Sequence, residues 1–275
     1  MKIQFLGTAA AEGVPALFCK CETCRIAREL GGKEIRTRCQ TLIDGKLMID
    51  FGPDTYHHAL VNGINLSNIH DYLITHKHID HLYPGDIHMF GSGYAQLPQD
   101  NPPYHFHGSE ESVEKIADVV NHVADRVQTH VLEPFKTYEI AGMRVTPLKA
   151  NHDGQMPFIY IIESDGKGVL YLHDTGWMPE ETEDYLYTNR PHFDLIAFDC
   201  CFGTWENRKS YGGHMPFSQN RQIAQRMKDE GMIDENTKLV VNHFSHNAPN
   251  VLYRDRAAYE QYGYIMAYDG MELEI

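Results

Sequence analysis

A cluster of metal-binding side chains directly follows an apolar segment near residue 75. Residues 71–75 have a β-type, mostly apolar composition and lead into His76, His78, Asp80 and His81 within six positions. Residues two apart at the end of a strand point the same way, so His76 and His78 can bind one ion. Asp80 and His81 then turn away at the next bend, toward a second ion. The spacing therefore predicts a centre for metal ions at a strand end.

Three cysteines lie close together near the amino terminus, at Cys19, Cys21 and Cys24. Six cysteines in 275 residues are too few for a disulfide scaffold, and this spacing is too tight for ordinary disulfides. A cluster of this kind predicts a metal site of its own. The remaining cysteines are predicted to be small buried residues, and they are Cys39, Cys200 and Cys201.

Short apolar runs bounded by turn residues are predicted to form the strands that position these groups. They cover residues 2–6, 41–43, 46–49, 72–75, 143–148, 158–163, 168–172, 194–198, 238–242 and 264–268. Helices are predicted at 109–123, 218–230 and 251–262, the last two each closed by a glycine. This order predicts two sheets packed face to face and covered by helices, in a single domain over residues 1–275.

The segment from Thr75 to His81 resembles the HxHxDH signature of the metallo-β-lactamase-fold hydrolases. The resemblance implies an α/β fold of the αββα sandwich type and further ligands after later strands. The chain offers His152, Asp174 in an Asp-Thr-Gly turn, and His243, each where an apolar run ends. By this resemblance one ion is bound by His76, His78 and His152, the other by Asp80, His81 and His243, and Asp174 bridges the two.

Asp50 also matches an aspartate of this family, at the end of an early strand. It is predicted to orient a ligating histidine, and the alternative is a turn aspartate before Gly52. His173 departs from the family pattern, because relatives commonly have a small or apolar residue at that position.

The cysteine cluster, with Ala27 and Arg28 after it, resembles a stretch of the cyclic phosphodiesterases that accompany carbon-phosphorus lyase in phosphonate metabolism. In that family the three thiolates and a histidine hold one structural zinc, which implies a site formed here by Cys19, Cys21, Cys24 and His246. Three cysteines and one histidine make a closed tetrahedral site. Cytosolic thiols without metal are the alternative.

His214, in the segment Tyr211-Gly212-Gly213-His214-Met215, matches the proposed general acid of those phosphodiesterases. Ester cleavage at phosphorus needs a proton for the departing alkoxide, which a histidine can deliver. The alternative is a histidine at the entrance of a helix.

Together these resemblances imply a cytoplasmic metallohydrolase that cleaves small, cyclic or linear phosphodiesters. Two divalent ions, zinc, manganese or iron, would share a hydroxide that attacks phosphorus, with Asp80 taking part in the catalytic site. The substrate stays open between a phosphoribosyl cyclic phosphate, a 2′,3′-cyclic nucleotide and an unrelated diester. A homodimer also stays open.

The net charge of −14 weighs against a nucleic-acid or membrane partner. The rival function of tRNA 3′-end processing needs a basic surface, but residues 86–103 contain no Lys or Arg. Apolar runs are too short to span a bilayer, and no export signal is recognised. Lactam or lactone hydrolysis is a second rival. A non-catalytic carrier of the kind found in cofactor biosynthesis is a third, although such proteins tend to lose ligands that are all present here.

Overall fold

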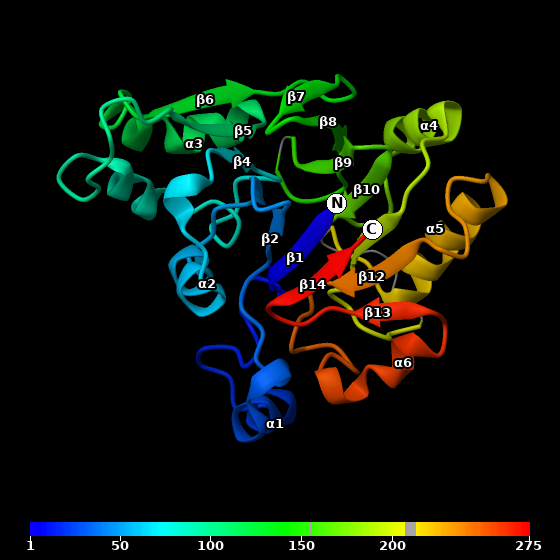
Figure 1. Ribbon diagram of the computed structural model, residues 1–275. Coiled ribbons are helices and arrows are strands. Elements are labelled where there is room, and N and C mark those ends of the chain that lie inside the picture. Colours follow the sequence, from blue (N-terminus) through cyan, green and yellow to red (C-terminus); the bar gives the residue numbers. More distant parts are fainter. Residues whose placement is uncertain (155, 207–212) are drawn as a thin grey trace.

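The protein folds as two seven-stranded sheets packed face to face, with helices on both outer faces (Figure 1). This computed structural model describes residues 1–154, 156–206 and 213–275. The layers confirm the predicted αββα sandwich. Among the described residues, no helix is long and apolar enough to cross a membrane.

The first sheet has the strand order β14-β1-β2-β3-β4-β5-β6. Its strands are β1 (Lys2–Gly7), β2 (Gln40–Ile43), β3 (Leu47–Ile49), β4 (Asp71–Leu73), β5 (Tyr104–Gly108), β6 (Val127–Val131) and β14 (Met271–Glu274). The strands from β3 to β6 run parallel. Their carboxyl ends therefore lie at one edge of the sheet, where side chains from separate loops can meet.

The second sheet has the order β13-β12-β11-β10-β9-β8-β7. Its strands are β7 (Tyr138–Ile140), β8 (Met143–Lys149), β9 (Phe158–Ser164), β10 (Lys167–Leu172), β11 (Leu195–Asp199), β12 (Lys238–Asn242) and β13 (Tyr264–Met266). The strands from β10 to β13 are parallel, so this sheet also brings its loops together at one edge.

Helices cover the outer faces of both sheets (Figure 1). The α-helices are α1 (Glu22–Leu30), α2 (Thr55–Asn62), α3 (Glu110–Asn121), α4 (Glu180–Asn189), α5 (Phe217–Asp229) and α6 (Ala257–Glu260). Short 3₁₀ helices are η1 (Gly32–Glu34), η2 (Leu66–Asn68), η3 (Pro84–Phe90) and η4 (Tyr253–Asp255). Of the predicted helices, those at 109–123 and 218–230 are confirmed as α3 and α5.

The predicted helix over residues 251–262 is wrong, because its first residues are extended and only η4 and α6 form there. The Glu34 carboxylate accepts hydrogen bonds from the backbone N–H groups of Tyr253 and Arg254, at 2.7 and 3.0 Å. This contact with a distant part of the chain fixes where the helical turn begins, and sequence periodicity does not report it.

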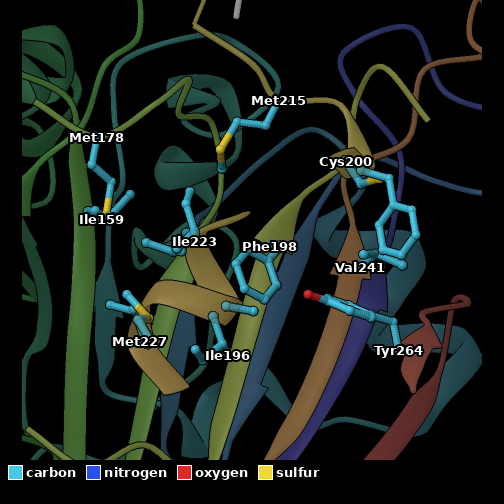
Figure 2. Packing of buried hydrophobic residues seen from close by; sticks show 14 of the residues in the cluster. Ile159, Met178, Ile196, Phe198, Cys200, Met215, Ile223, Met227, Val241 and Tyr264 are labelled. Carbon is cyan, nitrogen blue, oxygen red and sulfur yellow. The ribbon is translucent and has the colours of Figure 1, made fainter. Parts of the chain in front are cut away.

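Buried apolar side chains hold the layers together. One cluster lies between the sheets and joins Phe5 and Ile49 of the first sheet to Tyr160 and Tyr171 of the second. Another lies outside the second sheet, where Phe198 and others pack under α5 (Figure 2). Each such side chain contributes about 1.5–3 kcal/mol through burial. The two sheets therefore share one inner core.

Candidate metal centre

Acidic and histidine side chains gather where strands of both sheets end. Asp50 follows β3, Asp174 closely follows β10 and His243 follows β12, and all three have left-handed backbone, with φ values of 70°, 51° and 59°. Such a conformation is uncommon for residues other than glycine and carries a strain that clusters at functional positions. The strand ends therefore place these side chains by holding unusual backbone turns.

The three histidines predicted to bind one ion lie together. Atoms of His76, His78 and His152 that can bind a metal lie within 4.8 Å of one another. His152 Nε2 is 3.1 Å from His78 Nδ1, although 74 residues separate them in the chain. The turn after Asp174 holds the His152 loop in place, because Asn151 N–H donates to Thr175 Oγ1 at 3.0 Å.

The residues predicted for the other ion form a second, buried group of Asp80, His81, Asp174 and His243. Oδ2 of Asp174 is 2.7 Å from His81 Nε2 and 3.3 Å from His76 Nε2, whereas Oδ1 is 2.7 Å from His243 Nε2. One carboxylate thus lies between both groups of histidines. This is the position that the bridging role requires.

The metal-binding atoms of these residues are arranged for bound cations rather than for hydrogen bonds with one another. Nε2 of His76, His81 and His243 and Oδ1 of Asp174 are buried, and none forms a hydrogen bond of acceptable geometry with any described residue. Their short separations without such geometry indicate lone pairs that converge on common points. Imidazole nitrogen and carboxylate oxygen suit zinc, manganese and iron. The residues present therefore fit a pair of divalent ions.

The charges in this group are strongly coupled. Burial opposes a positive charge on His81, but the carboxylates of Asp174, Asp80 and Asp50 outweigh burial and raise the pKa of His81 well above its ordinary value. Burial likewise raises the pKa of Asp174, but His243 and His81 outweigh it and hold that pKa well below its usual range. The centre thus has anionic carboxylates that attract cations, and protons compete with metal for its histidines.

Asp50 is positioned to orient His81. Its Oδ2 accepts a hydrogen bond of 2.6 Å from His81 Nδ1, and its Oδ1 accepts from the backbone N–H of Thr75 at 2.8 Å. Because Nδ1 carries the proton in this bond, Nε2 presents a lone pair to the metal centre. The geometry favours the orienting role over a simple turn aspartate.

Asp199 is a functional candidate that sequence reasoning missed. This fully buried residue ends β11, and its Oδ2 accepts a hydrogen bond of 2.8 Å from His214 Nδ1 and lies 3.4 Å from His243 Nδ1. Its Oδ1 accepts from the backbone N–H of Cys201 and Met215, at 3.0 and 3.1 Å. The available signal was an aspartate directly after an apolar run, a position that Asp50 also occupies.

His214 lies beside the metal centre, with its ring centroid 4.9 Å from that of His152 and 5.3 Å from that of His243. Burial lowers its pKa, but the carboxylates of Asp199 and Asp174 outweigh burial and raise that pKa above its ordinary value. Since Nδ1 bonds to Asp199, Nε2 is the nitrogen left to meet a substrate. His214 also lies within ligand distance of His243 and Asp174, so geometry alone permits metal binding too.

A glycine permits this close packing. Gly213 has a φ of 77°, and a Cβ added there would lie 2.5 Å from the Cα of His152. Its carbonyl oxygen accepts a hydrogen bond from His152 Nδ1 at 3.2 Å. A side chain at this position would push the His214 and His152 loops apart. Tyr211 and Gly212, which belong to the same sequence motif, lie outside the described residues.

His173 is buried and belongs to neither ligand group. Its ring centroid lies 4.0 Å from that of Tyr171, and burial lowers its pKa to about 3. It is therefore a neutral, buried residue outside both ligand groups.

Helix α3 links the two loops that carry the first group of histidines. The carboxylate of Glu111 accepts from Lys77 Nζ at 2.7 Å and from the backbone N–H of Met156 at 3.2 Å. One turn later, Lys115 Nζ donates to the carbonyl oxygens of Lys77 and Leu82, the latter at 2.8 Å. Lys77 lies between two ligands and Met156 lies just beyond His152, so this helix sets how far apart the loops are.

We expect Glu111→Gln to weaken binding of one ion, because the amide loses the ion pair with Lys77. Partners that orient ligands contribute about 10- to 100-fold to metal affinity, and we expect the lower end, about tenfold, for this indirect link. Chelator competition on the purified protein measures the two affinities separately. Glu114→Gln, a substitution of an exposed residue on the same helix, is the control. Equal affinities in wild type and Glu111→Gln would contradict this role.

The cysteine cluster forms a separate group with His246. The metal-binding atoms of Cys19, Cys21, Cys24 and His246 lie within 4.8 Å of one another, and His246 Nδ1 is 3.6 Å from Cys19 Sγ and 3.5 Å from Cys21 Sγ. Cys21 caps α1. Burial raises the pKa of its thiol, but hydrogen bonds from the Cys24 backbone and from His246 outweigh burial and lower that pKa to about 6. A thiolate at this position suits a bound cation.

We expect Cys21→Ala to bind about one metal ion fewer per chain while the other ions are retained. It should also melt at a lower temperature, because structural zinc contributes folding free energy. Elemental analysis and thermal unfolding measure the two effects. Cys200→Ala, which removes a thiol from the apolar core, controls for destabilisation without metal loss. Loss of every ion, or of none, would argue against a separate site.

A family model for the Beta-lactamase superfamily domain matches residues 46–244 of the chain. This range includes every predicted ligand of the two-ion centre. The chain belongs to the β-lactamase superfamily. The predicted superfamily is thus confirmed, and most members of this superfamily are metal-dependent hydrolases.

Known proteins resemble the chain over its whole length. Coenzyme PQQ synthesis protein B from Methylorubrum extorquens strain AM1 is 24% identical, with all of both chains covered. Among solved structures, a diphosphatase from the PhnP family has a TM-score of 0.75 at 21% identity, covering 100% of this chain and 97% of that one. The structure of Zn²⁺-bound PqqB from Methylobacterium extorquens has a TM-score of 0.77 at 20% sequence identity, with both chains fully covered. At these identities the structures establish the fold.

Proposed function

We propose that the protein is a metal-dependent phosphodiesterase that hydrolyses small, cyclic ribose-type phosphodiesters. The observation that carries the proposal is the buried Asp174 carboxylate, which lies between His76 of one histidine group and His81 and His243 of the other. When bound, two divalent ions would supply a water of lowered pKa and stabilise charge on the phosphoryl oxygens. His76, His78 and His152 would hold one, and Asp80, His81 and His243 the other.

The protein's own groups support the rest of the reaction. Asp199 holds His214 with Nδ1 inward, so that the Nε2 proton can pass to the departing alkoxide oxygen. Asp50 likewise accepts a hydrogen bond from Nδ1 of His81 and so holds that imidazole in one orientation. A general acid matters for an ester of ribose, because an alkoxide is a poor leaving group without a proton.

A second candidate is a role in cofactor biosynthesis, favoured by the full-length similarity to coenzyme PQQ synthesis protein B. The complete set of metal-binding side chains favours the hydrolase instead. Processing of tRNA 3′ ends is a third candidate, because human short-form tRNase Z shares the fold with a TM-score of 0.68 at 17% identity, covering 100% of this chain and 99% of that one. The net charge of −14 weighs against a polyanionic RNA partner.

Turnover of a substrate panel by the metal-loaded protein tests the proposal. The panel comprises a phosphoribosyl cyclic phosphate, 2′,3′-cyclic nucleotides, an aryl phosphodiester, a lactam, a lactone and a precursor tRNA. We expect cyclic ribose phosphates to show the highest kcat/KM. Cleavage of the tRNA alone would move the function to RNA processing, and a protein that binds metal but turns over none of the panel would favour the cofactor-biosynthesis role.

A further inference from the structure

A groove on the outer face of the first sheet is lined by none of the residues of the metal centre. It has a volume of about 650 Å³, which is within the range of pockets for small organic molecules. Its lining comes from the turn after β3, the start of α2, η2, η3, the loop after η3 and the first residue of β5. We propose that this groove binds a flat, apolar ligand that carries one positive charge, of the class of arylalkylamines.

Aromatic rings make up much of the lining, which suits a flat ligand. They belong to Phe51, Tyr56, Tyr83, Phe90 and Tyr104, and Leu66 and Leu97 add aliphatic surface. The ring centroids of Phe90 and Tyr104 are 4.4 Å apart, and those of Phe51 and Phe90 are 6.3 Å apart. Tyr56 and the lining residue Met89 are 67% and 47% exposed, so apolar surface continues to the mouth of the groove.

The negative charge in the lining of the groove favours a positively charged ligand. Asp86 is the one charged residue among those that line it, and none of the described residues forms an ion pair or hydrogen bond with its carboxylate. A carboxylate beside aromatic faces attracts a cation, which the ring faces stabilise further. The same carboxylate repels phosphate esters. The groove is therefore unsuited to the substrates proposed for the metal centre and forms a site of its own.

Interactions behind the groove hold its walls apart. Arg126 Nη1 donates to the carbonyl oxygens of Phe90 and Ala95, at 2.9 and 3.0 Å, which fixes the loop after η3. Tyr104 Oη donates to the carbonyl oxygen of Ser67 at 3.2 Å and so ties η2 to the sheet. A groove formed in advance loses little conformational freedom when a ligand binds.

The groove shares backbone with the metal centre. Phe51 N–H donates to the carbonyl oxygen of His81 at 2.8 Å, and Tyr83 N–H donates to that of Phe51 at 2.7 Å. Phe51 and Tyr83 face the groove, whereas the adjoining Asp50 and His81 belong to the metal centre. A ligand in the groove thus packs against the same backbone that positions a candidate metal ligand.

Calorimetric titration of the metal-loaded protein with three naphthyl probes tests the proposal. The probes share one ring system and differ in charge: 1-naphthylmethylamine, 1-naphthalenemethanol and 1-naphthoate. We expect one amine to bind per chain, with an affinity about fivefold higher than that of the alcohol, because the amine gains one partly exposed ion pair. The naphthoate should bind with the lowest affinity. Asp86→Asn should bind amine and alcohol equally. Ala95→Trp should fill the groove and abolish binding, whereas Val131→Trp, at an exposed position of β6, should leave binding unchanged.

Binding of the amine that survives Ala95→Trp, or no binding to the wild-type protein, would overturn the proposal. Tightest binding of the naphthoate would overturn it as well. If the probes fail and sedimentation shows a dimer that Ala95→Trp dissociates, the groove belongs to an interface between two copies of the chain. Thermal unfolding of each variant establishes that it is folded. None of these measurements depends on phosphodiester turnover, so the result is independent of the proposed function.

Discussion

Replacing Asp80 with alanine is expected to reduce phosphodiester turnover by about 10³-fold and to remove about one metal ion per chain. Asp80 Oδ2 lies 3.2 Å from His81 Nε2, within the buried group that Asp174 and His243 complete. Two ions together provide several kcal/mol of transition-state stabilisation, and each 1.36 kcal/mol corresponds to a factor of ten in rate. Without this anionic ligand the second ion is expected to be lost.

Kinetics on a cyclic ribose phosphate, combined with elemental analysis of the same preparation, measures both effects. The matched control is Asp118→Ala, an exposed aspartate of α3 that is expected to retain full rate and metal content. Thermal unfolding of Asp80→Ala should still show a cooperative transition, because the layers depend on the apolar clusters. A near-normal rate with full metal content would show that Asp80 does not bind the second ion.

The first ligands of the metal centre could be predicted from the sequence because His76, His78, Asp80 and His81 come directly after one apolar strand. The strands before His76, His152, Asp174 and His243 all have several buried residues in sequence, and the polar residue after them stands out. Parallel strands β10 to β12 then bring their ends to one edge. Resemblance to the family singled out His152, Asp174 and His243 and supplied the pairing of ligands, because each of these residues taken alone is more often an ordinary surface, core or turn residue.

Asp199 could not be assigned because its role depends on a loop whose path sequence does not give. An aspartate after an apolar run is more often a turn residue. Only the folded chain brings His214, fifteen residues later, within 2.8 Å of its carboxylate. The Glu111 link and the Glu34 contact that starts η4 are likewise side-chain contacts between distant segments. Strand β5 was missed because its histidines, His105 and His107, interrupt the apolar pattern.

Removal of His214 is expected to slow turnover in proportion to how much the leaving group needs a proton. General acid catalysis typically contributes about 10² to 10⁴ in rate. We expect His214→Ala to lose about that factor on a cyclic ribose phosphate, whose leaving group is an alkoxide. On a nitrophenyl diester the loss should be much smaller, because nitrophenolate departs readily without a proton. Steady-state kinetics on both substrates measures the ratio.

Two comparisons separate the proton-donor role from its alternatives. Equal losses on both substrates would make His214 a residue that binds the phosphate in ground and transition states alike, and a lower metal content would make it a ligand. Asp199→Asn retains the shape of the residue that orients His214, but the amide cannot replace the carboxylate that raises the pKa of that imidazole. We therefore expect it to reproduce part of the substrate-dependent loss. If neither variant slows either substrate, His214 is simply a histidine at the entrance of α5.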